Sequence, residues 1–184
     1  MTSNNTWLKH LLAILFLLLV NVVYFFPQIQ GKVLRQGDLV SSDQGYKAVA
    51  EYSEKFDKTY FWNPAQFGGM PILTNAANPM NLVSNIYDYY NRLLPDPIGM
   101  YFMGCLLMYL LFIMLGLSPM LAAISSFPVV YGSGTLILWG AGHAAKIRTL
   151  IFTPLLIGGV WKIFEERKYL MGFLLLTLGF SFSF

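Results

Sequence analysis

The chain has 184 residues, of which 56% are hydrophobic and only 11% are charged, and its mean hydropathy is +0.56. This number of charged side chains is too small to cover the surface of a water-soluble globule of this size. The composition therefore indicates an integral membrane protein. The net charge of +3 is spread along the sequence without a run of lysine and arginine, which argues against a nucleic-acid partner.

Apolar segments long enough to approach a membrane crossing recur along the chain, since a crossing needs about 20 apolar residues. They cover residues 7–26, 98–117, 119–139, 147–164 and 169–184. We therefore predict an all-α transmembrane bundle of about five spans. No small-x-small cleavage site follows the first span, so we expect a retained anchor rather than a signal peptide. The last span is short and has no polar flank, so we expect the chain to be the truncated amino-terminal part of a longer polytopic protein.

A long polar loop separates the first span from the others and divides the chain into three parts: 1–26, the loop 27–97, and 98–184. The loop contains seven of the nine acidic residues. The basic residues beside the spans favour a cytoplasmic amino terminus, which places the loop outside the cytoplasm. The basic residues expected inside are Lys9, Lys162, Arg167 and Lys168.

Two short helices and one turn are predicted within this loop. Asp43 can cap an amphipathic helix, and Asn78 can cap a second one that ends at Pro95. Both helices would rest on the membrane or on the spans. Between them, prolines and adjacent glycines predict a shaped turn, formed by Asn63, Pro64, Gly68, Gly69 and Pro71. This turn either holds backbone amides close to a ligand or packs as an aromatic turn on the membrane surface.

Three segments, taken in their order and spacing, carry a resemblance to a known family. They are residues 33–38 soon after the first span, the turn at residues 62–71, and residues 141–146 between the third and fourth spans. Together they resemble the amino-terminal region of YfhO-type bacterial membrane proteins. That family is related to the GT-C superfamily of multi-span glycosyltransferases, and the likeness covers nearly the whole chain but only the front part of such a protein.

The resemblance implies sugar transfer at the outer face of a bacterial cytoplasmic membrane. A polyprenyl-phosphate-linked sugar would be the donor, a cell-envelope molecule the acceptor, and membrane lipids the surroundings. GT-C enzymes resemble one another in placing an acidic residue in the first external loop, where it acts on the acceptor or helps to hold a divalent cation. The matching position here is Asp38, and Asp43 is the second choice.

Physical chemistry gives Asp38 a role independently of the resemblance. Glycosyl transfer needs a base for the acceptor hydroxyl and a means of stabilising the departing phosphate. A carboxylate about a dozen residues beyond a span lies near the headgroup level, where both substrates meet. The alternative is an ordinary turn at Gly37 and Asp38, with Arg35 neutralising the charge.

A second candidate group, His143, Lys146 and Arg148, stands at the predicted start of the fourth span. Cationic side chains and helix-terminal amides favour an anion, so the group is a candidate clamp for the donor phosphate. His143 and Lys146 are three residues apart and would share a face if the turn is already helical, whereas Arg148 is expected to point elsewhere. The alternative is that the two cations extend to lipid headgroups and the histidine satisfies a backbone group.

Two classes of function remain open from the sequence. One is a glycosyltransferase, and the other is a non-enzymatic membrane component, either a flippase-like transporter or an assembly subunit whose loop binds a partner. Almost no ionisable residues fall within the predicted spans, which argues against a proton relay. Pro128 with Gly132 and Gly134 predict a bend in the third span, and Pro154 predicts one in the fourth. Such bends can open a cleft towards lipid, but they are also routine in membrane helices.

Overall fold

The computed structural model describes residues 5–58, 60–64, 67–71, 82–94 and 96–183, and this part of the chain is mostly helical. The helices are α1 (Thr6–Tyr24), α2 (Phe26–Ile29), α3 (Gly37–Phe56), α4 (Leu82–Leu93), α5 (Ile98–Met114), α6 (Pro119–Val130), α7 (Ser133–Ala141), α8 (Ala144–Phe164) and α9 (Tyr169–Ser183). Two short strands, β1 (Trp62–Asn63) and β2 (Met70–Pro71), pair antiparallel. The prediction of an all-α chain therefore holds apart from this small hairpin.

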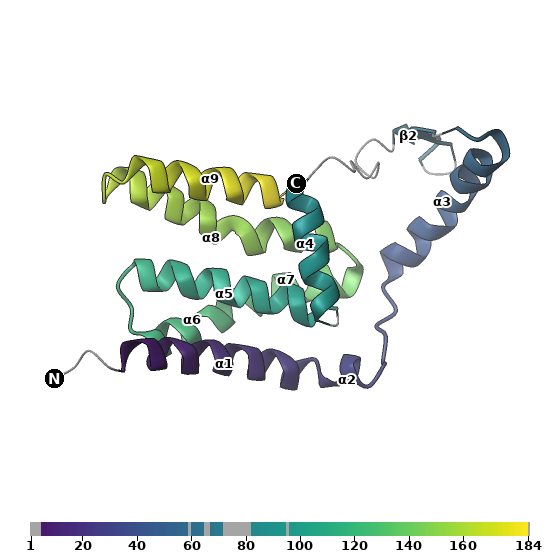
Figure 1. Ribbon diagram of the computed structural model, residues 1–184. Coiled ribbons are helices and arrows are strands. Elements are labelled where there is room, and N and C mark those ends of the chain that lie inside the picture. Colours follow the sequence, from purple (N-terminus) through teal and green to yellow (C-terminus); the bar gives the residue numbers. More distant parts are fainter. Residues whose placement is uncertain (1–4, 59, 65–66, 72–81, 95, 184) are drawn as a thin grey trace.

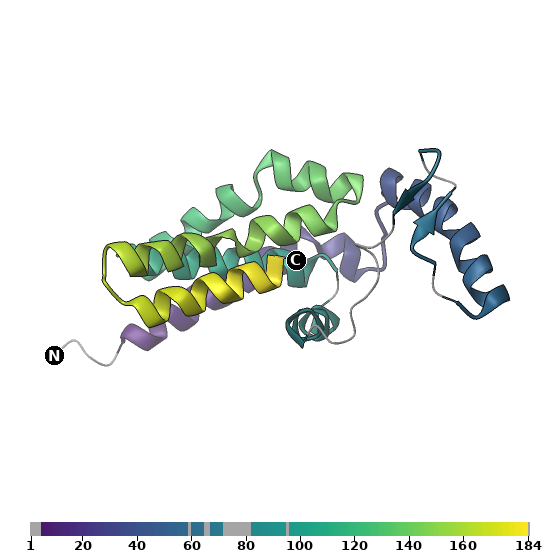
Figure 2. The ribbon, with the colours of Figure 1, turned by 90° about the horizontal axis from the view of Figure 1, so that it is seen from above.

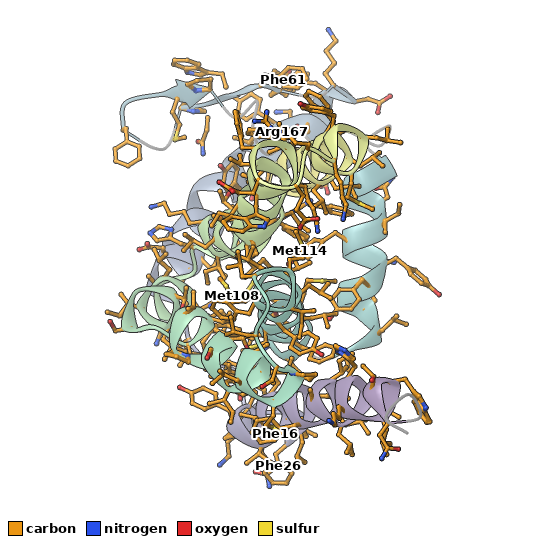
Figure 3. The ribbon with its side chains drawn as sticks, turned by 90° about the vertical axis from the view of Figure 1, so that its left-hand side faces the viewer. Phe16, Phe26, Phe61, Met108, Met114 and Arg167 are labelled. Carbon is orange, nitrogen blue, oxygen red and sulfur yellow. The ribbon has the colours of Figure 1, made fainter. Side chains whose placement is uncertain are left out.

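The long helices run back and forth between two ends of a bundle (Figure 1). At one end lie the start of α1 and the turns that join α5 to α6 and α8 to α9, and Figure 3 shows Arg167 at this end. The opposite end bears α2, α3 and α4, together with the beginnings of α5 and α8. Viewed from above, α3 and the hairpin extend beyond the bundle (Figure 2). The described residues of the predicted loop are thus gathered at a single end.

Two helices, α1 and α8, are long and apolar enough to cross a membrane. Helices α6 and α7 meet this criterion as a pair, although a bend of 50° separates them. Pro128 lies inside α6 and Gly132 lies at the break, so the bend predicted from these residues is confirmed. Helices α5 and α9 are apolar but shorter, with 17 and 15 residues.

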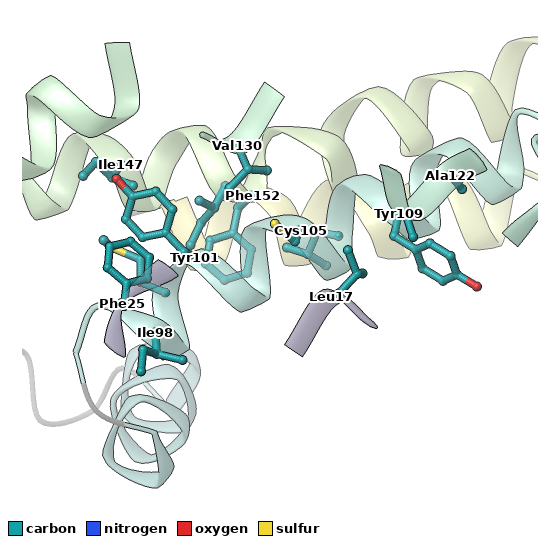
Figure 4. Close-up of a cluster of buried hydrophobic side chains, with 14 of the residues drawn as sticks. Leu17, Phe25, Ile98, Tyr101, Cys105, Tyr109, Ala122, Val130, Ile147 and Phe152 are labelled. Carbon is teal, nitrogen blue, oxygen red and sulfur yellow. The ribbon is translucent and has the colours of Figure 1, made fainter. Parts of the chain in front are cut away.

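An aromatic cluster fixes the end of the bundle from which the loop leaves. Phe25 is 2% exposed, and its ring centroid lies 4.9 Å from that of Tyr101, 5.9 Å from that of Tyr131 and 5.5 Å from that of Trp139. Figure 4 shows Phe25 and Tyr101 side by side within the buried cluster. Aromatic pairs at these distances stabilise by more than their buried area alone. The cluster therefore holds the end of α1 against α5 and α7.

A buried polar contact joins α1 to the α6–α7 connection. Asn21 is fully buried, and the Tyr131 hydroxyl donates a hydrogen bond of 2.7 Å to its Oδ1 atom. The Asn21 amide nitrogen in turn donates to the Leu17 carbonyl oxygen. Polar side chains that bond across helices favour one arrangement of apolar helices over the alternatives.

The structure corrects one helix boundary in the loop. Asp43 is not a cap, because α3 begins six residues earlier, at Gly37, with Gln36 in the extended conformation before it. The earlier start places Asp38 in the first turn of α3, where a carboxylate is favourable. The predicted cap at Asn78 lies outside the described residues, and α4 ends at Leu93, before the predicted stop at Pro95.

The predicted turn is the connection of the β1–β2 hairpin. Asn63 is fully buried and Pro64 is exposed. Gly69 has a φ of +122°, and a Cβ atom there would lie 2.6 Å from the Trp62 ring. A glycine is required at this position because the indole covers its α-carbon.

Candidate functional site

The structure brings together two side chains that the sequence separates by 105 positions. The His143 Nε2 atom lies 3.2 Å from the Asp38 Oδ2 atom. Asp38 belongs to the first turn of α3, and His143 immediately precedes α8. The side chains are 62% and 36% exposed, respectively, so both are accessible to a ligand from water. The pair, which we call the Asp38–His143 dyad, lies at the end of the bundle that bears the loop.

Close packing of α3 on the α7–α8 connection produces this contact. Gly142 ends α7 with a φ of +100°, and a Cβ atom there would lie 2.9 Å from the Leu39 Cγ atom. The Gln36 side-chain amide also donates a hydrogen bond to the Trp139 carbonyl oxygen. The bare α-carbon of Gly142 thus lets the beginning of α3 approach, and this approach positions Asp38 beside His143.

The predicted cationic group does not form a single cluster around the dyad. Lys146 is exposed on the first turn of α8. The Arg148 guanidinium lies over the Tyr87 ring, 4.5 Å from its centroid, and Nε donates a 2.6 Å hydrogen bond to the Phe182 carbonyl oxygen. Arg148 therefore faces α4 and α9, whereas His143 faces α3.

Two cavities at this end of the bundle share Asp96. One, of about 260 Å³, is lined by Gln28, Lys32, Gln36 and Trp139 as well as Asp96. The other, of about 300 Å³, is lined by Asp96 and Arg148 among others. Although Asp96 is exposed as a whole residue, partial burial of its carboxyl raises the pKa of that group. A carboxylate that borders two cavities is a candidate for ligand contact.

Sequence reasoning missed Asp96. The available signal was its position between Pro95 and Pro97, directly before the second apolar segment. Pro95 was interpreted only as the end of the preceding helix. The cavities form because the chain folds the start of α5 towards α2 and α8, and no local pattern reveals that proximity.

The remaining candidate residues lie apart from the dyad. Asp43 is within α3, and its side chain is outside the described part of the structure. Asn63, Pro64, Gly68, Gly69 and Pro71 belong to the hairpin segment, which lies beside α3 and beyond the bundle (Figure 1). The turn and Asp38 are therefore two separate features of the loop.

Within the described residues, no group of three or more His, Cys, Asp or Glu side chains is arranged to hold a metal ion. Asp38 and His143 are chemically suitable donors, but a divalent cation here would need further ligands from water or substrate.

An apolar cavity of about 230 Å³ lies beside the bend between α6 and α7. Its lining includes Gly104 of α5, Val130 of α6 and Pro154 of α8. Thr135 of α7, close to the bend, adds a polar group. Such a lining suits a hydrocarbon chain better than a polar ligand.

Comparison with protein-family models, with curated proteins and with solved structures finds no significant match to this chain. Its membrane character and its mostly helical fold are shown by the chain itself, through α1, α8 and the bent pair α6–α7.

Proposed function

We propose that this chain belongs to a GT-C-type membrane glycosyltransferase. It would transfer a sugar from a polyprenyl-phosphate-linked donor to a cell-envelope acceptor outside the bacterial cytoplasmic membrane. The observation that supports this proposal most directly is the Asp38–His143 contact of 3.2 Å. The resemblance of residues 33–38, 62–71 and 141–146 to YfhO-type proteins supplies the reaction class.

In the proposed reaction, Asp38 takes the proton from the acceptor hydroxyl as its oxygen bonds to the anomeric carbon. The bond from that carbon to the phosphate oxygen breaks, and polyprenyl phosphate leaves. His143 holds Oδ2 of the carboxylate and so leaves Oδ1 for the acceptor. Lys146 on the exposed first turn of α8 stabilises the departing phosphate, together with the amides of that turn.

The proposed topology has five crossings, with the amino terminus in the cytoplasm and residues 27–97 outside. Its support is the alternating course of the helices (Figure 1) and the basic residues of the segments at the end where α1 begins. Lys162 and Lys168 at that end both bind Glu166, and Lys9 lies in the first turn of α1. The apolar cavity beside the α6–α7 bend would receive part of the polyprenyl chain.

A transfer assay on the full-length protein in proteoliposomes tests the catalytic proposal. Removal of a general base costs about 10²–10⁴ in rate, so Asp38→Asn should reduce sugar transfer by that factor at unchanged abundance. Glu54→Gln is the matched control, since Glu54 is an exposed carboxylate on the same helix. Transfer by Asp38→Asn at the rate of Glu54→Gln would remove Asp38 from the mechanism.

A second assay separates donor binding from the proton transfer. Lys146→Ala should raise the KM for the lipid-linked donor and leave the KM for the acceptor unchanged. An unaltered donor dependence would discredit the phosphate role of Lys146.

Cysteine labelling in intact cells tests the topology. In a background in which Cys105 is replaced by serine, Val33→Cys should react with a membrane-impermeant maleimide, because Val33 is 92% exposed. Glu165→Cys, in the connection between α8 and α9, should react only after the membrane is permeabilised. The opposite pattern would invert the proposed orientation.

A further inference from the structure

The cavity of about 260 Å³ near the dyad is lined by polar residues to which the proposed reaction gives no role. It lies between α2, the beginning of α3, the end of α7 and the segment that precedes α5. Gln28, Lys32, Gln36, Asp96 and Trp139 contribute to its lining. We propose that this cavity binds one sugar ring, and its role in transfer rests on the proposed function.

The polar groups of the cavity match a polyol. The Gln28 Oε1 atom is buried and has no hydrogen-bond partner within the described structure, and a buried acceptor without a donor is unfavourable. A rotation of the Gln28 side chain towards the cavity would let a sugar hydroxyl donate to this oxygen. Lys32 supplies donors and Asp96 supplies acceptors, so the alternating hydroxyls of a sugar find both kinds of partner.

The same groups disfavour other ligands. The charges of Lys32 and Asp96 cancel, so the cavity has no excess positive charge to bind a phosphate. These two charges and the amides of two glutamines also make the cavity unsuitable for a hydrocarbon chain. Trp139 adds an aromatic residue, which suits the C–H face of a sugar. The volume is below the usual range for drug-sized ligands, about 300–1,000 Å³, and so corresponds to a single ring.

The cavity is placed to present a sugar to the dyad. Gln36 is two residues before Asp38, and Trp139 is four residues before His143. The hydrogen bond between the Gln36 amide and the Trp139 carbonyl oxygen joins the two sides of the cavity next to the dyad. A ring bound here would belong either to the acceptor or to the donor, both of which present the same hydroxyl chemistry.

Direct binding of free monosaccharides tests the inference without requiring transfer. The full chain in lipid nanodiscs would be mixed with glucose, galactose, mannose or N-acetylglucosamine, and saturation-transfer NMR would report contact with the ring protons. We expect at least one of these sugars to bind, and Gln28→Leu to weaken it about tenfold or more. Gln30→Leu is the matched control, because Gln30 is an exposed glutamine at the end of the same short helix.

The outcomes separate this inference from the proposed function. Asp38→Asn should retain sugar binding while it loses transfer. Sugar binding by the unsubstituted full-length protein, combined with no transferase activity of that same protein, would uphold the cavity and refute the enzyme. Absence of binding by all four sugars, or equal binding by Gln28→Leu and Gln30→Leu, would overturn the sugar site. Competition of the bound sugar with acceptor or donor in the transfer assay would identify which substrate it represents.

Discussion

Gly142→Ala should impair transfer although it changes neither member of the dyad. Gly142 has a φ of +100°, a left-handed conformation that L-residues rarely adopt. The added methyl group would also lie 2.9 Å from the Leu39 Cγ atom and 3.4 Å from the Leu39 backbone nitrogen. Because the second contact is with backbone, the side chain of Leu39 cannot relieve it completely by rotating. The start of α3 must therefore shift away from α8.

The expected magnitude has two parts. Left-handed backbone costs a non-glycine residue roughly 1–2 kcal/mol. In a domain of this size, 1 kcal/mol corresponds to about 2–4 °C, so we expect the Tm to fall by roughly 2–8 °C. The contact of 3.2 Å between Asp38 and His143 is already at the long end of hydrogen-bond distances, so a shift of about half an ångström breaks it. Transfer should then fall by about tenfold or more.

Thermal unfolding in detergent and the transfer assay measure the two parts separately. Leu39→Ala, introduced into the Gly142→Ala protein, removes the Cγ atom and should restore part of the transfer but not the Tm. Gly140→Ala is the control, since a Cβ atom there meets nothing within 4 Å and its φ is ordinary. If Gly142→Ala transferred sugar as well as Gly140→Ala, the packing of α3 on Gly142 would not determine the geometry of the dyad.

Two further predictions concern other contacts of the fold. Gly172→Leu should lower the Tm by several degrees, because a Cβ atom there would lie 2.8 Å from a backbone oxygen of α8, whereas Gly134→Ala, with open space, should be nearly neutral. Burial raises the pKa of Asp96 in the folded protein above its ordinary value of 3.8. The contribution of this carboxyl to the stability of the fold is therefore complete below pH 3.8, and it is lost as the pH rises through the folded pKa. Asp96→Asn should therefore raise the Tm at pH 7 but not at pH 3, and a constant difference between these pH values would refute the burial effect.

The apolar helices could be predicted from the sequence because each is encoded by its own residues. The segment predicted as residues 147–164 is α8, which begins only three residues earlier, at Ala144. The bend in the third segment also has a local cause in Pro128 and Gly132. Burial in a bilayer requires a continuous apolar run, and such a run is visible without knowledge of its neighbours.

The site depends on contacts between distant segments, which the sequence does not reveal. Asp38 and His143 could each be proposed from chemistry and resemblance, but their separation of 3.2 Å follows from the packing of α3 on Gly142. The start of α3 was predicted seven residues too late for the same reason, since the predicted cap was Asp43 and the observed cap is Gln36. Gln36 and Leu39 contact α7 and its end, and such tertiary contacts can extend a helix beyond its strongest local signal.

The contacts that hold α3 in place are separate from the Asp38–His143 dyad. This separation suits the proposed change of protonation at Asp38. An ion pair as exposed as the Asp38–His143 dyad adds at most about 1 kcal/mol to stability, and less in salt. The dyad is therefore a weak attachment for α3. The attachment comes instead from Leu39 on the bare α-carbon of Gly142 and from the Gln36 amide on a backbone carbonyl, and neither contact titrates. The proposed reaction moves a proton on and off Asp38, and these contacts would keep α3 docked while it does so.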